Sequence, residues 1–267
     1  MDFSRMEEVR AGWSEDRKYH AWDNGGQEYF LRLFQLGLPV SEPLELTQED
    51  GQVRFVERWL SGRMAEDALP ALPQEEQYRL GREAGRVLRA LHGCPAPAEA
   101  EDWESRFNKK LDRKIHVYRG CPLQYQNGEA FIRYMEESRG LLRGRPQCAQ
   151  HGDYHAGNMM LCESRLFLID FDRPDVGDPW EEFNRIVWSA QLSPAFARGT
   201  VDGYFGGEPP LAFWKLLALY IASNTLSSLP WAVPFGEEQV AIMREQAAQV
   251  LDWYDGMQRV IPSWYII

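Results

Sequence analysis

The chain has 267 residues, of which 44% are hydrophobic and 26% charged, and its formal net charge is −11. This length accommodates one large domain or two modest lobes around a buried core. We expect a cytoplasmic protein without a membrane span. No signal peptide is recognisable, and the longest apolar stretch, Leu216 to Ala222, is far shorter than the roughly 20 residues that a span requires.

The first sixty residues have a composition typical of β-strands. Short aromatic or β-branched runs at residues 17–22, 28–33 and 53–59 are separated by turn residues. Asp23-Asn24-Gly25-Gly26 predicts a hairpin turn between the first two runs, because Asn and Gly tolerate positive φ.

After Gly62 the apolar spacing becomes helical. Residues 75–92 predict a first helix that ends at Gly93. Further helical stripes are Phe107, Leu111, Ile115 and Tyr118; Phe183, Ile186, Val187 and Ala190; Leu211, Trp214, Leu217 and Tyr220; and Val240, Met243, Ala247, Val250, Leu251 and Tyr254.

One predicted helix carries a basic face formed by Lys109, Lys110, Arg113 and Lys114. Such a face can indicate nucleic-acid binding. We interpret it as a solvated surface, because Asp112 interrupts it and the chain as a whole is acidic.

The most informative segment is His151-Gly152-Asp153-Tyr154-His155-Ala156-Gly157-Asn158, followed by an apolar strand that ends at Asp170. Phosphoryl transfer from a magnesium nucleotide needs one group that accepts the proton of the attacking hydroxyl and two oxygen ligands for cations. Asp153 provides the first group, and Asn158 and Asp170 provide the other two. This order and spacing match the kinase catalytic loop and its metal-binding Asp.

HGDxHxGN followed by IDFD is similar to the aminoglycoside phosphotransferase family, within the wider choline-kinase and protein-kinase-like group. The resemblance implies an α+β bilobal kinase-like fold, with a β-rich small lobe at residues 1–61 and a helical lobe at residues 62–267. It also implies ATP or GTP and Mg²⁺ as cofactors, with nucleotide bound in the cleft between the lobes.

Three N-terminal segments resemble the nucleotide-binding parts of that family. Residues 12–19 resemble the nucleotide loop, with Ser14 as a phosphate contact. Residues 29–33 resemble the strand that bears the phosphate-binding cation, here Arg32, and residues 55–62 resemble the hinge, with Trp59 against the nucleotide. Leu80 to His92 resembles the first helix of the large lobe.

The sequence departs from the family pattern in the small lobe. Arg32 stands where the family usually has Lys, and the two cations differ in geometry. The run from Leu33 to Val40 leaves no room for the helix whose Glu pairs with that cation; Glu28, Glu42 and Glu45 are possible substitutes. Beyond the catalytic segment, Asp172 could support the metal, contact a cationic substrate or cap a turn, and the resemblance implies that Asp178 braces the catalytic loop.

Two features bear on function beyond the motif. Residues 151–267 carry 7 basic and 15 acidic side chains, a net of −8, which favours magnesium and a cationic acceptor and disfavours nucleic acid. Plain solubility is the alternative explanation. The four cysteines (Cys94, Cys121, Cys148 and Cys162) lie singly, which favours free thiols over a disulfide framework.

The leading hypothesis is a kinase that transfers the γ-phosphoryl group of ATP or GTP to a hydroxyl of a small polar, cationic molecule. A nucleotide-binding regulatory module with little catalysis is an alternative, motivated by the shortened small lobe. A second alternative is a metal-dependent hydrolase with His151, Asp153 and His155 as ligands. We prefer to interpret both histidines as braces of the loop. The sequence leaves the oligomeric state open.

Overall fold

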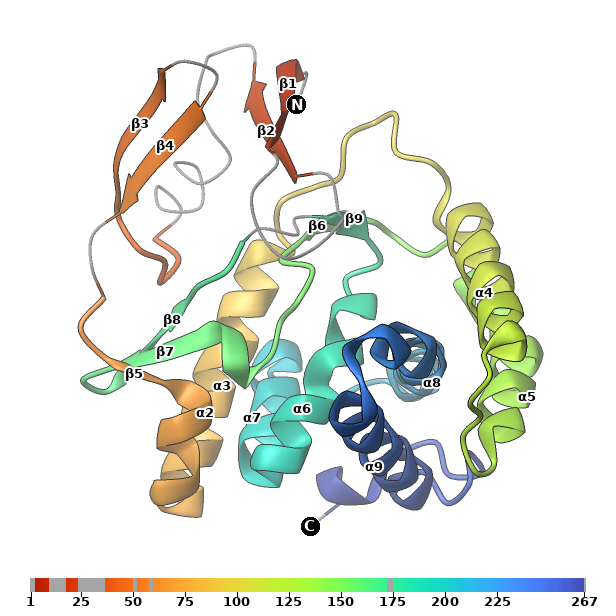
Figure 1. Cartoon of the computed structure of the whole chain (residues 1–267). Helices are drawn as coiled ribbons and strands as arrows, with labels where there is room; N and C mark the ends of the chain where they lie inside the picture. Colours follow the sequence, from red (N-terminus) through yellow and green to blue (C-terminus); the bar gives the residue numbers. More distant parts are fainter. Residues whose placement is uncertain are drawn as a thin grey trace.

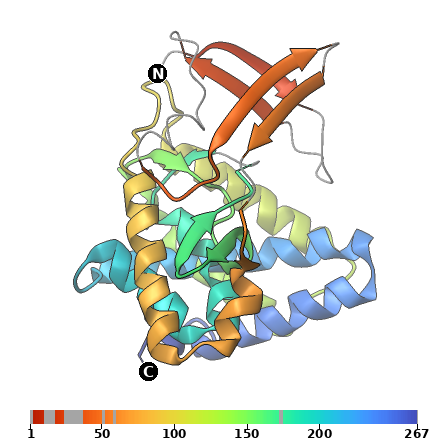
Figure 2. The ribbon, with the colours of Figure 1, turned by 90° about the vertical axis from the view of Figure 1, so that its left-hand side faces the viewer.

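The computed structural model describes residues 3–9, 18–23, 37–49, 52–57, 60–171 and 175–266, with side chains from residues 37–42, 60–171 and 175–266. Two antiparallel hairpins lie together above the helices (Figures 1 and 2). They are β1 (Phe3–Val9) with β2 (Lys18–Asp23), and β3 (Pro43–Glu49) with β4 (Gln52–Glu57).

The predicted strands at residues 17–22 and 53–59 correspond to β2 and β4. The strands β1 and β3 were not predicted, because their alternation of apolar and polar residues is weak. The predicted strand at residues 28–33 and the turn residues Asn24 to Gly26 lie outside the described residues, as does the first half of the run from Leu33 to Val40.

The larger lobe is helical, so the bilobal α+β architecture is confirmed. The predicted helix at residues 75–92 is α3 (Gln74–Leu91), and its polar N-terminal turn carries Glu75 and Glu76. The other long helices are α4 (Trp103–Gly120), α5 (Gly128–Ser138), α7 (Pro194–Phe205), α8 (Leu211–Ala232) and α9 (Glu237–Trp253), with shorter helices α2 (Ala65–Ala68) and α6 (Ile186–Leu192).

The helical stripes predicted from the sequence lie in the core. Phe107, Leu111 and Tyr118 are fully buried on α4, and the stripe that begins at Phe183 is buried along the 3₁₀ helix η4 (Glu181–Arg185) and α6. Leu211 is an exception: its side chain is 56% exposed, because it occupies the first turn of α8.

Helices α3 and α7 cross at unusually short range. A Cβ atom on Gly81 or Gly85 would collide with the backbone carbonyl of Phe196 or Thr200 on α7. In the same way, a Cβ atom on Gly199 or Gly203 of α7 would collide with the backbone of α3. The close contact therefore depends on glycine at the crossing and cannot be reproduced with a larger residue.

The helix α8 is the most apolar element of the large lobe. The segment Leu211–Phe235 is long and apolar enough to cross a membrane by length and composition, a feature that the shorter run Leu216 to Ala222 did not reveal. Two thirds of its most apolar window is buried inside the protein, against α4, α5 and α9. Such burial is typical of the central helix of a folded lobe.

Short strands between the two lobes position the loops of the site. The strand β7 (Met159–Cys162) pairs antiparallel with β8 (Arg165–Leu168) and with β5 (Arg63–Met64). The strand β6 (Cys148–Gln150) pairs with β9 (Asp175–Gly177). Val40 forms a parallel bridge to Leu168, which connects the end of the small lobe to this sheet.

Candidate active site

The segment His151 to Asn158 forms the loop between β6 and β7, and a buried carboxylate holds its start. The backbone N–H groups of His151 and Gly152 donate to the two oxygens of Glu182, at 2.7 and 2.9 Å. Glu182 lies on η4 and is 2% exposed. Because charge-assisted hydrogen bonds are strong and their geometry is fixed, Glu182 sets the path of the loop toward Asp153.

His151 braces the loop through both ring nitrogens. Nδ1 accepts from the Asp153 N–H at 3.4 Å, so Nε2 carries the proton and donates to the Ile169 carbonyl at 3.0 Å. Burial lowers the pKa of His151, which keeps the ring neutral. His155 resembles it: Nδ1 accepts from the Gly157 N–H at 3.0 Å. These hydrogen bonds favour the bracing role over the metal-ligand role.

The carboxylate of Asp153 is partly exposed and lies against two side chains. Arg185, at the end of η4, places Nε 3.0 Å from Oδ1 of Asp153. His155 Nε2 lies 3.6 Å from the same oxygen. Asp153 is therefore held in place by a cation while one face of the carboxylate remains accessible. The sequence did not predict Arg185, because it follows Asp153 by 32 residues and lies in an apolar stripe.

Asn158 and Asp170 lie at the same end of the β7–β8 hairpin. The Met159–Leu168 pair is the last of the ladder, and the Ile169 N–H donates to the Asn158 carbonyl at 3.1 Å. The Asn158 Nδ2 group donates to the backbone carbonyl of Asp153 at 2.9 Å. This bond directs the amide nitrogen into the loop and leaves the amide oxygen as the group suited to a cation.

Asp170 lies just beyond the apolar strand β8. Its side chain is exposed, and its φ is 62°, in the left-handed region that non-glycine residues rarely adopt. The chain leaves β8 and turns at this residue, so that the carboxylate does not continue the buried side of the strand. A backbone conformation of this kind costs on the order of 1 kcal/mol and is concentrated at functional sites.

The donor set at this end of the hairpin fits magnesium. An amide oxygen and a carboxylate are hard ligands, and Mg²⁺ usually takes one or two protein groups together with phosphate oxygens and water. Asn158 directly precedes β7 and Asp170 follows β8 by two residues, so the two groups lie beyond the same end of the hairpin.

Asp178 does not contact the catalytic loop through its carboxylate. It is fully buried and accepts two bonds from Arg145, at 2.6 and 2.9 Å, and one from the Tyr220 hydroxyl at 2.6 Å. Arg145 also stacks on Trp180, with 3.8 Å to the ring centroid. The backbone N–H groups at the start of the loop are instead held by Glu182, and the Asp178 carboxylate joins Arg145, which precedes β6, to Tyr220 of α8.

Four predicted contacts lie outside the described residues. These are Ser14, Arg32 and Trp59 of the expected nucleotide site, and Asp172 beyond β8. Glu28 and Glu45 are outside the described side chains as well. Glu42 is described as half-buried, at the point where the small lobe meets the hairpin sheet.

The basic face of α4 is not uniformly solvated. Lys109 and Arg113 are exposed, as predicted, and Lys109 pairs with Glu101 at 2.6 Å. Lys110 and Lys114 instead turn toward the lobe. Lys110 contacts Glu181 of η4 at 3.1 Å, and Lys114 donates to the Ser223 carbonyl of α8 at 3.2 Å. The helical spacing in the sequence correctly predicts that these lysines share one face of α4. It does not predict which of them lies beside η4.

The four cysteines are free thiols, as expected. Cys94 and Cys148 are buried, and burial raises the pKa of the Cys148 thiol well above its usual value. A thiol of this kind is unreactive.

A family model described as the phosphotransferase enzyme family matches residues 33–214. No curated protein matches the chain in a sequence comparison. Among solved structures, a choline/ethanolamine kinase family protein from Mesorhizobium loti is 18% identical, with a TM-score of 0.66 over 96% of this chain and 91% of the other.

Two aminoglycoside phosphotransferases are similar in fold. A thermostable mutant of APH(4)-Ia in a ternary complex with ADP and hygromycin B is 18% identical, with a TM-score of 0.60 over 93% of this chain and 94% of the other. The gentamicin–APH(2")-IIa complex is 16% identical, with a TM-score of 0.58 over 92% of both chains.

Proposed function

The chain belongs to the phosphotransferase enzyme family, and from this premise we propose that it transfers the γ-phosphoryl group of ATP to a hydroxyl of a small polar molecule. It is a kinase-type phosphotransferase. The observation that carries the proposal is the arrangement around Asp153. A partly exposed carboxylate is fixed by Arg185, and its backbone carbonyl holds the amide of Asn158.

ATP is the proposed donor because similar solved structures contain adenine nucleotides, including the ADP and hygromycin B complex described above. The small-molecule acceptor is proposed on the same basis, since hygromycin B and gentamicin occupy those relatives. The overall charge of −8 over residues 151–267 favours a cationic acceptor at long range. The cation beside Asp153, Arg185, has the opposite sign.

In this proposal Asp153 accepts the proton of the acceptor hydroxyl as its oxygen attacks the γ-phosphorus. Arg185 and the hydrogen bonds that Glu182 accepts from the loop keep Asp153 in position, and most of the rate comes from such positioning and from charge neutralisation. Asn158 and Asp170 would hold Mg²⁺. When bound, the metal neutralises charge on the phosphate oxygens.

The test is the Asp153→Asn variant, which keeps the size of the side chain but removes the proton acceptor. We expect turnover with ATP to fall by about 10²–10⁴-fold, the usual contribution of a general base. Nucleotide affinity, measured by calorimetry with magnesium, should stay close to that of the wild type.

The matched control is Asp112→Asn, the same change at a carboxylate that is 69% exposed on α4. It should leave turnover and affinity unchanged. A parallel loss of nucleotide affinity and turnover in Asp153→Asn would show that Asp153 is a ligand or a structural residue and not the base.

A further inference from the structure

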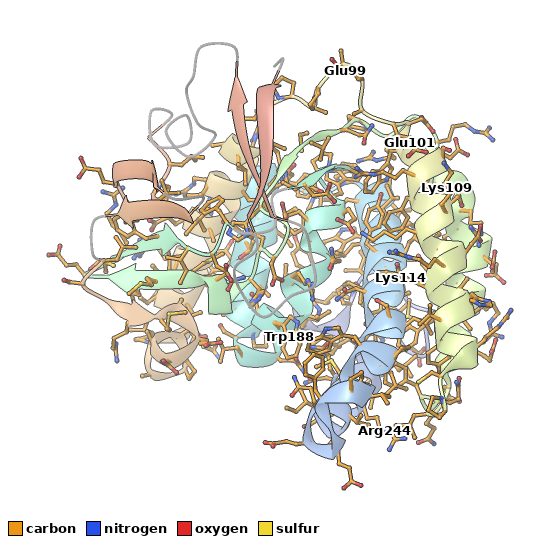
Figure 3. All side chains as sticks on the ribbon, turned by 45° about the horizontal axis from the view of Figure 1, so that its top comes forward. Glu99, Glu101, Lys109, Lys114, Trp188 and Arg244 are labelled. Carbon is orange, nitrogen blue, oxygen red and sulfur yellow. The ribbon has the colours of Figure 1, made fainter. Side chains whose placement is uncertain are left out.

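Three cations near the site form what we call the basic cluster: Lys110 and Lys114 of α4, and Arg185 of η4, which lie close enough for the charges of Lys110 and Arg185 to act on Lys114. One member, Arg185, contacts the carboxylate of the proposed catalytic base Asp153 at 3.0 Å. Lys114 extends from α4 toward α8, whereas Lys109 lies on the same helix and is 72% exposed (Figure 3).

Within the described residues, Lys114 has no carboxylate in ion-pair contact. Its ammonium donates to the Ser223 carbonyl of α8 at 3.2 Å, and its side chain is only partly exposed. Burial, and after it the neighbouring cations Lys110, Arg185 and Arg113, lower the pKa of Lys114 to about 7, against the opposing effect of Glu181. Lys114 is therefore held by a backbone carbonyl and has no carboxylate in ion-pair contact.

Glu181 is not an ion-pair partner of Lys114, because its carboxylate contacts Lys110. Lys110 lies 3.1 Å from the Glu181 carboxylate. Burial on its own would raise the pKa of Glu181, yet the attraction of Lys110, Lys114 and Arg185 holds it below the usual value. Glu181 is in contact with Lys110 and Arg185 is in contact with Asp153, so Lys114 is the member of this group that has no carboxylate in ion-pair contact.

A structural role does not explain this lysine. Removing an ammonium from water without a paired anion is strongly unfavourable, and an apolar side chain of similar length would suit the site between α4 and α8 better. Side chains that reduce stability in this way are typical of binding and catalytic sites. Here Lys114 lies close enough to Arg185, the cation that contacts Asp153, for the charge of Arg185 to lower its pKa.

We propose that Lys114 and Arg185 bind an anionic group, a carboxylate or a phosphate, on the acceptor whose hydroxyl faces Asp153. The inference rests on the proposed function and adds the substrate class: a hydroxy acid or a phosphorylated polyol. The net charge of the C-terminal half does not decide against it, because exposed charges are screened over roughly 8–10 Å whereas the cluster is in direct contact with the ligand.

The first part of the test uses three acceptors on one six-carbon polyhydroxyl chain. Gluconate carries a carboxylate at the first carbon, glucitol a neutral hydroxymethyl group and glucamine an aminomethyl group. We expect the wild type to phosphorylate gluconate with a kcat/KM about tenfold or more above that of glucitol, and glucamine least well. Glucitol 6-phosphate distinguishes a phosphate from a carboxylate as the preferred anion.

The second part changes the lysine. Lys114→Met should raise the KM for gluconate by about tenfold with kcat nearly unchanged, and should leave the KM for glucitol unaffected. Lys109→Met is the matched control on the exposed side of α4, and we expect no change in either constant. If Lys114→Met fails to fold, Lys114→Gln keeps a polar end and removes only the charge.

The third part measures anion binding without turnover. Sulfate is titrated calorimetrically into protein saturated with ADP and magnesium, which blocks the nucleotide site. Sulfate binding that is lost in Lys114→Met and retained in Lys109→Met supports the anion site. If sulfate binds in this way but no acceptor is phosphorylated, the anion site stands and only the proposed function fails. The anion site is overturned by equal sulfate affinity in both variants, by no sulfate binding to the wild type, or by preference for glucamine.

Discussion

At the scale of single residues, Glu182 is the side chain on which the geometry of the loop depends. It accepts from two consecutive backbone N–H groups, those of His151 and Gly152. An amide in its place has one acceptor oxygen, so one N–H would be left facing the NH₂ group. We expect Glu182→Gln to lower the free energy of unfolding by about 1–3 kcal/mol and to reduce kcat more than it raises KM.

The measurements are denaturant unfolding and steady-state kinetics with ATP. Glu237→Gln, at an exposed position in the first turn of α9, is the control and should match the wild type in both. An unchanged kcat in Glu182→Gln would show that the loop keeps its position without this carboxylate.

Asp170 gives a prediction about the metal. Replacing it with Ala removes the carboxylate that we propose as a metal ligand, while Asn158, the other proposed ligand, keeps its bond to the Asp153 carbonyl. We expect Asp170→Ala to weaken nucleotide binding with magnesium present far more than binding with a chelator present. Calorimetry under the two conditions is the test, and equal losses would rule out a metal role.

At the scale of elements, the crossing of α3 and α7 limits what the sequence tolerates. A Cβ on Gly85 would overlap the Thr200 carbonyl and the Tyr204 backbone nitrogen, and neither is a flexible side chain. The helices must then move apart, so we expect Gly85→Ala to lower the free energy of unfolding by about 1–3 kcal/mol.

The same substitution at the last residue of α4 supplies the comparison. A Cβ on Gly120 meets no atom within 4 Å. Gly120→Ala should therefore stabilise by roughly 0.5–1 kcal/mol, because Ala loses less backbone entropy in a helix. Thermal unfolding of both variants distinguishes steric overlap at the crossing from a general intolerance of Ala.

At the scale of the whole molecule, Lys114 links stability to pH. Its folded pKa of about 7 lies below the ordinary value of 10.5, so between these two values the unfolded chain binds more protons than the folded one. The contribution of this group to stability therefore rises with pH across that window. We expect Lys114→Met to be more stable than the wild type at pH 6, with a difference that shrinks toward pH 9.

The measurement is the melting temperature of both proteins from pH 6 to pH 9. The difference between them isolates Lys114. Burial also raises the pKa of other groups, that of Tyr125 to about 12, but these groups affect both proteins equally at higher pH. A constant difference across this range would contradict an ammonium with a depressed pKa.

The sequence alone was sufficient for the class of fold, the helical lobe and the three central residues of the site. These features depend on local sequence patterns. The helices α3 and α4 follow from apolar residues repeated at helical spacing, and the site residues Asp153, Asn158 and Asp170 follow from their spacing around one hairpin. A motif in which every member lies within twenty residues needs no knowledge of long-range contacts. The predicted roles of these residues stay predictions, since the structure gives their positions and not their chemistry.

Only the tertiary structure decided which distant side chains surround that motif. Arg185 contacts Asp153 although the two residues are 32 positions apart, and Glu182 holds the start of the loop. Lys114 contacts α8, although the sequence predicts that the basic face of its helix is exposed to solvent. Helical periodicity reports which residues share a face but not what packs against it. The sign of the charge beside the proposed base therefore follows from the packing of α4 against η4 and α8, and not from the net charge of the chain.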